Sequence, residues 1–105
     1  MKEISVSDLK AMHDAKKDFV LLDVREPDEL ATASIAWAMA IPMGDVPQRV
    51  AEVPKDKTIA VLCHGGARSA RVTSFLNENG YPEAVNVAGG IRAWSAEIDP
   101  NVPDY

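Results

Sequence analysis

The sequence contains a single cysteine, Cys63, so the chain cannot form an internal disulfide bond. Unpaired thiols persist in reducing compartments, and we therefore expect a cytoplasmic protein. No apolar run approaches the roughly 18 residues of a membrane-spanning helix, and the polar N-terminal segment MKEISVSDLK does not resemble a signal peptide. These absences predict a protein with no membrane partner.

Positive charge is also scarce, because 11 lysines and arginines face 16 acidic residues and give a formal net charge of −5. This balance disfavours general nucleic-acid binding. Neither a dinucleotide-binding nor a phosphate-loop fingerprint occurs, and the histidines and the cysteine do not have the spacing of a metal site. We therefore expect neither a cofactor nor a metal.

The 105 residues, 47% hydrophobic and 26% charged, suit one globular domain. We expect this domain over residues 1–98. Residues 99–105, DPNVPDY, hold two prolines and two aspartates, and they predict a short irregular acidic tail.

The segment around Cys63 changes its hydrophobic period. Thr58–Leu62 is a short apolar run typical of a buried strand, and Gly65 and Gly66 follow the cysteine. Apolar residues then recur at helical spacing until Asn79-Gly80, which predicts a helix over Ser69–Asn79. The segment therefore predicts a strand, a tight loop and a helix, with a thiol at the carboxyl end of the strand.

The predicted loop favours an ionised cysteine. Gly65 and Gly66 allow backbone N–H groups to point inward and bind an anion, and the following helix N-terminus and Arg68 add positive charge. Such settings lower a cysteine pKa from about 8.5 to roughly 3.5–7.5. Cys63 is thus a candidate nucleophile; the alternative is a small buried apolar side chain.

The rest of the chain alternates strands and helices, which predicts an α/β fold with a parallel sheet covered on both faces. Four other strands are expected. The first is short and ends at Ile4, and the rest span Phe19–Val24, Met39–Pro42 and Ala84–Val87. Four other helices are expected. The first follows a capping box at Ser5 and Asp8, and the second starts at Pro27. The third carries Val46, Val50 and Val53 behind Asp45, and the fourth opens at Gly89-Gly90. In the first helix we expect Leu9, Met12 and Ala15 to be buried.

Charged residues appear abruptly where the Phe19–Val24 strand ends. Asp23 and Arg25 would lie at the carboxyl edge of the sheet, where α/β proteins place their sites. They either support the chemistry of Cys63 or form an ion pair that braces neighbouring loops.

Three motifs resemble the rhodanese-like sulfurtransferases, in the family's order and over Ile4 to Trp94. Cys63–Ser69 fits the active-site loop C-x-x-G-x-R-S, Asp23–Pro27 matches the DVREP segment, and Val85–Trp94 is similar to the closing segment with its glycine pair and tryptophan. The resemblance implies a central five-stranded parallel sheet flanked by helices on both faces. Thr32–Ala40 departs from the family, since it lacks the usual glycine-histidine pair and contains Trp37, which either packs on the core or walls the substrate mouth.

The resemblance implies a sulfurtransferase of the thiosulfate:cyanide type. Cys63 would take a sulfane sulfur from a thiosulfate-like anion, hold it as a persulfide, and pass it to cyanide or a physiological thiol. Arg68 would orient an oxyanion or hold the loop, Ser69 would cap the helix or bond to the sulfur, and His64 would donate at the rim or face solvent. The loop expected to bind substrate comprises His64, Gly65, Gly66, Ala67, Arg68 and Ser69, with Asp23 and Arg25 as supporting residues.

Two other classes of function remain open. The domain could be a persulfide relay, sulfur carrier or regulatory binding module that acts with a partner protein. Arsenate reductase or phosphatase chemistry is a weaker alternative, because related phosphatases use C-x5-R whereas Cys63 and Arg68 are separated by four residues. The shorter loop should form a tighter pocket, which suits a sulfur atom better than a phosphate.

Overall fold

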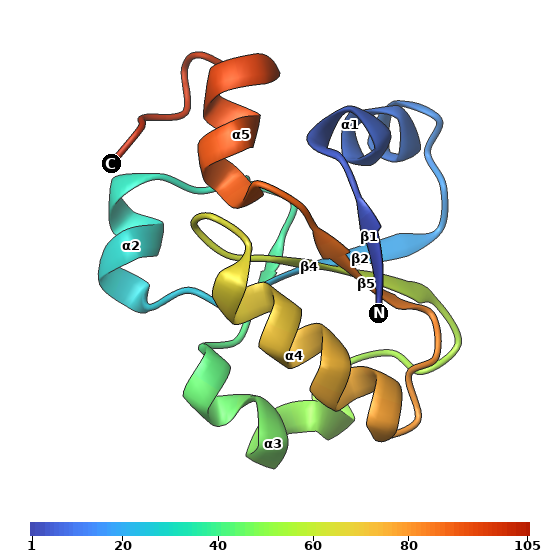
Figure 1. Ribbon diagram of the computed structural model, residues 1–105. Coiled ribbons are helices and arrows are strands. Elements are labelled where there is room, and N and C mark those ends of the chain that lie inside the picture. The colour runs from blue at the N-terminus through green and yellow to red at the C-terminus, as the bar shows by residue number, and fades with distance from the viewer.

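The computed structural model describes residues 1–105 and contains one five-stranded sheet with every strand parallel. The strand order is β1-β5-β4-β2-β3 (Figure 1). The predicted α/β architecture with a five-stranded parallel sheet is therefore confirmed. The strands are β1 (Lys2–Ile4), β2 (Phe19–Asp23), β3 (Met39–Ala40), β4 (Thr58–Leu62) and β5 (Ala84–Val87).

Helices cover both faces of the sheet, and none is long and apolar enough to cross a membrane. One hydrophobic cluster joins the sheet to α1 and α5, and a second joins it to α3 and α4. Alternate residues of β4 enter the two clusters, as the two-residue period of a strand requires. The helices are α1 (Val6–Asp14), α2 (Pro27–Thr32), α3 (Val46–Arg49), α4 (Ala67–Glu78) and α5 (Gly90–Glu97), with 3₁₀ turns at Met43–Asp45 and Val50–Glu52.

The start of α1 follows the predicted capping box. The Asp8 N–H donates to Ser5 Oγ over 3.0 Å, and the Ser5 N–H donates to an Asp8 carboxylate oxygen over 3.2 Å. The predicted buried face was only partly right: Leu9 is buried, but Met12 is half-buried and Ala15 is exposed. The helix ends at Asp14, so Ala15 lies beyond its last turn, and Val6 is buried in its first turn instead.

Other boundaries also differ from the expectations, and β3 ends at Ala40 rather than at Pro42. The strand after Phe19 ends at Asp23, and α4 begins two residues before Ser69 because Gly66, with φ 115°, occupies its N-cap. The valine-bearing segment after Asp45 splits into α3 and a 3₁₀ turn, and the Asp45 side chain makes no capping hydrogen bond. At the start of α4, the left-handed conformation of Gly66, not apolar spacing, sets the boundary.

Trp37 packs on the core. Its ring lies edge-on to Phe19 and Trp94 and stacks on the exposed His13 with 3.9 Å between ring centroids. These contacts agree with the first of the two expectations for this residue. The indole side chain fills the end of the cluster beneath α1 and α5.

Residues 99–105 form no helix or strand but fold back onto the domain. Val102 is buried in the cluster with α1 and α5, and its carbonyl accepts a 2.5 Å hydrogen bond from Ser95 Oγ. The chain then runs toward α2, where Figure 1 places the C-terminus.

Candidate active site

The carboxyl ends of the central strands converge on Cys63. β4 lies between β2 and β5, and Cys63 is the first residue after β4. Val24 extends the pairing beyond β2, because its N–H donates to the Leu62 carbonyl over 2.9 Å. The parallel register therefore brings the predicted Asp23–Arg25 segment to the sheet edge that carries the thiol.

The sulfur of Cys63 is enclosed, with 1% of the residue exposed. The Gly66 N–H donates to Sγ over 3.1 Å, and Ser69 Oγ lies 3.2 Å from Sγ. Both groups belong to the start of α4, where free N–H groups give positive potential. Ser69 thus contacts the sulfur rather than serving as the helix cap.

The N-terminus of α5 holds the other side of the loop. The Ile91 N–H donates to the Cys63 carbonyl over 2.9 Å, and the Arg92 N–H donates to the His64 carbonyl over 3.1 Å. This approach requires glycine at position 90, because a Cβ there would lie 2.3 Å from the His64 carbonyl oxygen. The glycine pair of the closing motif is therefore part of the architecture of the Cys63 loop.

Arg68 is paired with Glu29 of α2. Two guanidinium nitrogens donate to the two carboxylate oxygens over 2.6 and 2.8 Å. The hydrogen bonds from Arg68 hold the pKa of Glu29 well below its ordinary range, and the carboxylate raises the pKa of Arg68. This geometry corresponds to the loop-holding alternative, since Glu29 occupies the planar fork of the arginine.

Asp23 and Arg25 form a buried ion pair, with side chains 1% and 0% exposed. Arg25 Nη2 donates to Asp23 over 2.7 Å and to the Ala33 carbonyl, beyond α2, over 2.8 Å. The pair joins the end of β2 to the chain that leaves α2. Its contacts are those of a brace between loops, the second of the two predicted roles.

Besides Glu29, two residues that the sequence did not single out complete the surroundings of the loop. Asn86, in the middle of β5, lies 2.5 Å from Ser69 Oγ through its Oδ1 atom. Tyr105 stacks on His64 with 4.3 Å between ring centroids, and beneath it His64 Nε2 is buried without a hydrogen-bond partner. A polar residue in the otherwise apolar β5 was a usable signal, whereas no local pattern announces Tyr105.

Comparison with known proteins agrees with this geometry. The family model for the rhodanese-like domain matches residues 5–97. The chain belongs to the rhodanese-like domain family.

Several relatives cover most or nearly all of the chain. The Bacillus subtilis protein YtwF is 41% identical over 100 residues, covering 95% of this chain and 96% of YtwF. A sulfurtransferase of Allochromatium vinosum is 39% identical over 79 residues, covering 75% of this chain and 74% of that protein. The crystal structure of a rhodanese-like domain protein from Staphylococcus aureus superposes with a TM-score of 0.84 at 38% identity, covering 90% of this chain and 91% of that one.

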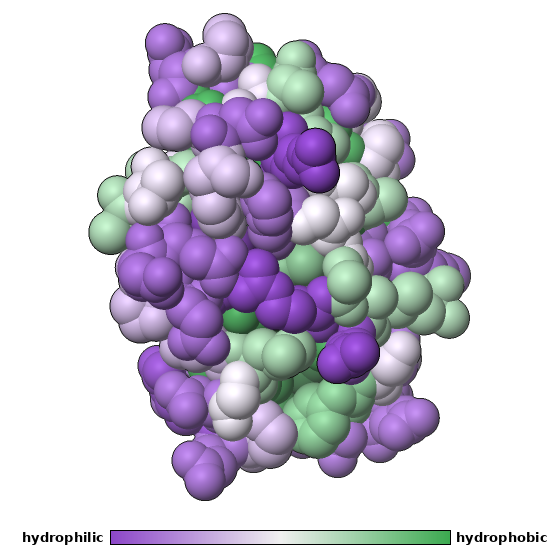
Figure 2. Space-filling model, turned by 60° about the vertical axis from the view of Figure 1, so that its left-hand side comes forward, coloured by the Kyte–Doolittle hydropathy of each residue, from purple (hydrophilic) through white to green (hydrophobic).

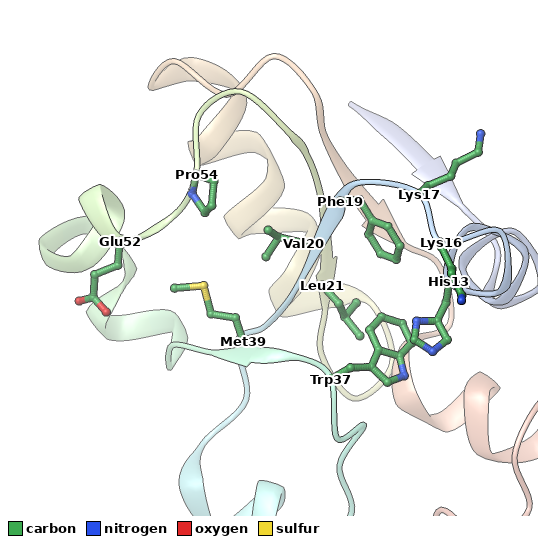
Figure 3. Close-up of a pocket in the computed structure, with 10 residues that line it drawn as sticks. All are labelled: His13, Lys16, Lys17, Phe19, Val20, Leu21, Trp37, Met39, Glu52 and Pro54. Atoms are coloured by element: carbon green, nitrogen blue, oxygen red, sulfur yellow. The ribbon is translucent and has the colours of Figure 1, made fainter.

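The two cavities of this rhodanese-like domain lie away from the Cys63 loop. The larger, about 540 Å³, opens beside the first half of β2, where β3 is too short to cover it (Figure 3). The smaller, about 170 Å³, lies between α3 and α4. The residues lining the larger cavity are His13, Lys16, Lys17, Phe19, Val20, Leu21, Trp37, Met39, Glu52 and Pro54.

Proposed function

We propose that this rhodanese-like domain is a sulfurtransferase whose Cys63 carries the sulfur as a persulfide. The observation that carries the proposal is the position of Cys63 Sγ at the start of α4, within reach of the Gly66 N–H and the Ser69 hydroxyl. These donors face a sulfur atom that must hold negative charge during the reaction. The A. vinosum relative, a sulfurtransferase by name, supports the same reaction class.

The proposed reaction has two displacements. The Cys63 thiolate attacks the outer sulfur of a thiosulfate-like donor, forms an S–S bond, and releases sulfite with the electron pair of the broken bond. The persulfide carries its charge on the outer sulfur. Cyanide or a thiolate acceptor then attacks that sulfur, and the bonding pair returns to Cys63. Covalent catalysis of this kind divides one difficult transfer into two easier steps.

The loop residues have distinct proposed roles. The Gly66 N–H donates to Sγ, and we expect it to receive the outer sulfur together with the backbone N–H groups of His64, Gly65 and Ala67, while Ser69 contacts Sγ. Arg68 holds the loop to α2 through Glu29 and adds positive charge. Asp23 and Arg25 keep the neighbouring loop in place. The four-residue gap between Cys63 and Arg68 favours sulfur over phosphate or arsenate as the bound group.

The thiocyanate assay tests the proposal. Wild-type protein should convert thiosulfate and cyanide into thiocyanate, and Cys63→Ala should abolish this activity. Intact mass spectrometry after thiosulfate treatment should show the mass of one added sulfur atom, removed by reductant and absent in the variant. If wild-type protein gains no removable sulfur, the persulfide mechanism is wrong.

Comparing the rates with two sulfur donors distinguishes a sulfur relay from a free-standing enzyme. If the domain serves a sulfur-carrier partner in the cytoplasm, transfer from a protein persulfide will be much faster than turnover with thiosulfate. If the two rates are similar, the domain works as a free-standing enzyme. A Cys63→Ala control in each assay shows that both routes use the same sulfur.

A further inference from the structure

Asn86 places a buried amide inside an otherwise apolar strand. β5 reads AVNV, and Asn86 is 1% exposed. Its Nδ2 donates to Glu3 Oε2 over 2.9 Å and approaches the Gly66 carbonyl oxygen at 3.3 Å. These contacts fix the amide so that Oδ1 faces Ser69. Burying an amide is costly unless it is hydrogen-bonded, so the contacts made by this residue call for an explanation beyond filling the sheet.

Ser69 has one hydroxyl proton and several acceptors for it. Asn86 Oδ1 lies 2.5 Å from Ser69 Oγ, whereas Cys63 Sγ and the Gly66 carbonyl oxygen each lie 3.2 Å away. Ser69 Oγ can donate in all three contacts, and the contact with Asn86 Oδ1 is the shortest and joins two buried side chains. While Cys63 is a neutral thiol, the Ser69 proton therefore points to Asn86, and the Ser69 oxygen is free to accept the S–H of Cys63.

A thiolate at Cys63 changes this arrangement. The charged sulfur attracts the Ser69 proton, because hydrogen bonds to ions are stronger than neutral ones. Turning the hydroxyl toward the sulfur, however, leaves Asn86 Oδ1 buried without a donor, which carries a free-energy penalty. Asn86 thus opposes the bare thiolate and favours states with no charge on Sγ, namely the thiol and the persulfide, whose charge lies on the outer sulfur.

We propose that Asn86 is a positioning residue that directs the Ser69 hydroxyl and so sets the balance among thiol, thiolate and persulfide at Cys63. The effect on the persulfide rests on the proposed function, whereas the effect on the thiol and the thiolate does not. Asn86 acts through Ser69 and does not itself contact the sulfur atom in the structure.

Other ionisable groups lie near the loop, and all of them except Glu3, which loses the Nδ2 donor of Asn86, would keep their contacts in the Asn86 variants. A change in the pH profile of Cys63 alkylation would then report on the Ser69 hydroxyl. These groups are Glu3 of β1, Asp23 and Arg25 at the end of β2, Glu29 of α2, His64 of the loop, Arg68 of α4, the exposed Arg92 of α5, and Tyr105.

The test is the pH midpoint of iodoacetamide alkylation, measured without any sulfur donor. Asn86→Leu removes the competing acceptor at similar volume, so the midpoint should fall by about one pH unit. Asn86→Asp keeps an acceptor and adds negative charge, so the midpoint should rise. Opposite shifts from one position are not expected of a residue that merely supports the loop; shifts in the same direction would overturn the proposal.

The decisive comparison repeats the Asn86→Leu measurement in a protein that also carries Ser69→Ala. The fall caused by Asn86→Leu should vanish when Ser69→Ala is also present, because the hydroxyl that Asn86 directs is gone. A fall that persists would show that Asn86 does not act through Ser69. Glu3→Gln is the matched control, since glutamine can still accept from Nδ2 and should leave the midpoint nearly unchanged.

Folding is checked by circular dichroism. If Asn86→Leu does not fold, Asn86→Asp takes its place. The rise in the alkylation midpoint that Asn86→Asp causes must then become clearly smaller when Ser69→Ala is also present. Because this assay needs no sulfur transfer, the positioning role can stand even if the thiocyanate assay fails. The persulfide part is tested separately: thiosulfate-loaded Asn86→Leu should lose its sulfur to cyanide faster than wild type.

Discussion

Glu29 joins the Cys63 loop to α2 and to the last residues of the chain. Its carboxylate accepts two hydrogen bonds from Arg68 and one of 2.7 Å from the Tyr105 hydroxyl. These contacts favour the ionised form, so the folded-state pKa of Glu29 lies below the ordinary value of 4.5. A group with a depressed pKa adds stability above that ordinary value, and the stability is lost as the pH falls below it.

We therefore predict that Glu29→Gln weakens the protein at neutral pH and flattens its acid sensitivity. At pH 7 the variant should lose about 1 kcal/mol, typical of a well-formed but partly exposed ion pair. Below about pH 4.5 the unfolded wild-type chain takes up a proton that the folded protein does not, so wild-type stability falls more steeply than that of the variant. Urea unfolding at several pH values measures both effects.

Glu52→Gln is the matched control, because Glu52 also pairs with an arginine, Arg49, but on an exposed 3₁₀ turn. The pKa of Glu52 is also lowered by its arginine, yet solvent screens the pair and the substitution should change stability little. Equal effects at the two positions would show that the link from Arg68 to α2 has no special importance.

For individual residues, the sequence predicted the Cys63 loop but not the distant side chains that contact it. Residues Cys63 to Ser69 are contiguous, so residue types and a motif were enough to identify them. Glu29, Asn86 and Tyr105 reach the loop from three distant segments, and only the tertiary fold brings them there. The side chains that decide the local electrostatics are thus harder to predict than the nucleophile candidate.

Among the elements, the start of α5 and the Cys63 loop fit together without room for a side chain. Gly90 has φ 59°, and a Cβ there would lie 2.3 Å from the His64 carbonyl oxygen and 2.5 Å from that of Cys63. Both obstacles are backbone atoms, which cannot rotate away as a flexible side chain could. Any substitution must therefore separate α5 from the loop.

We predict that Gly90→Ala destabilises the fold by roughly 2–5 kcal/mol, from left-handed backbone strain plus steric overlap. Thiocyanate-forming activity should fall with it, because the loop loses its hydrogen bonds to α5. Gly44→Ala is the control: nothing lies within 4 Å of its Cβ position, and stability should stay within about 0.5 kcal/mol of wild type. Denaturant unfolding compares the two; an unaffected Gly90→Ala would contradict the close approach.

The existence and order of the elements were predicted better than their ends. The capping residues identified the start of α1 correctly because the box is local, whereas its hydrophobic period predicted the buried face only in part. The start of α4 was placed two residues late because Gly66 ends the loop in a left-handed conformation that spacing does not encode. β3 pairs only with the end of β2, and the 3₁₀ turn before α3 packs against α4, so the ends of these elements depend on tertiary contacts.

For the molecule as a whole, the C-terminal residues close over the edge of the sheet that carries Cys63. Hydrophilic residues predominate on the face seen in Figure 2, with hydrophobic residues in smaller areas among them. Tyr105, 39% exposed, lies over His64, and its hydroxyl accepts from Arg25 Nη1 over 2.9 Å. Burial raises the pKa of Tyr105, so its hydroxyl stays protonated near neutral pH and can donate to Glu29. The tail predicted only as irregular thus covers part of the loop.

We predict that Tyr105→Ala makes Cys63 more accessible. Removing the ring uncovers His64 and breaks the bridge between Arg25 and Glu29, so local opening of the loop should become easier. Iodoacetamide should alkylate Cys63 several-fold faster at a fixed pH. Tyr105→Phe, which keeps the ring but loses the bridging hydroxyl, should give an intermediate rate. Asp104→Ala, at an exposed neighbour with no hydrogen bond or ion pair in the structure, should match wild type. If Tyr105→Ala also reacts at the wild-type rate, access to the thiol is controlled by the loop itself, and the tail only stabilises the fold.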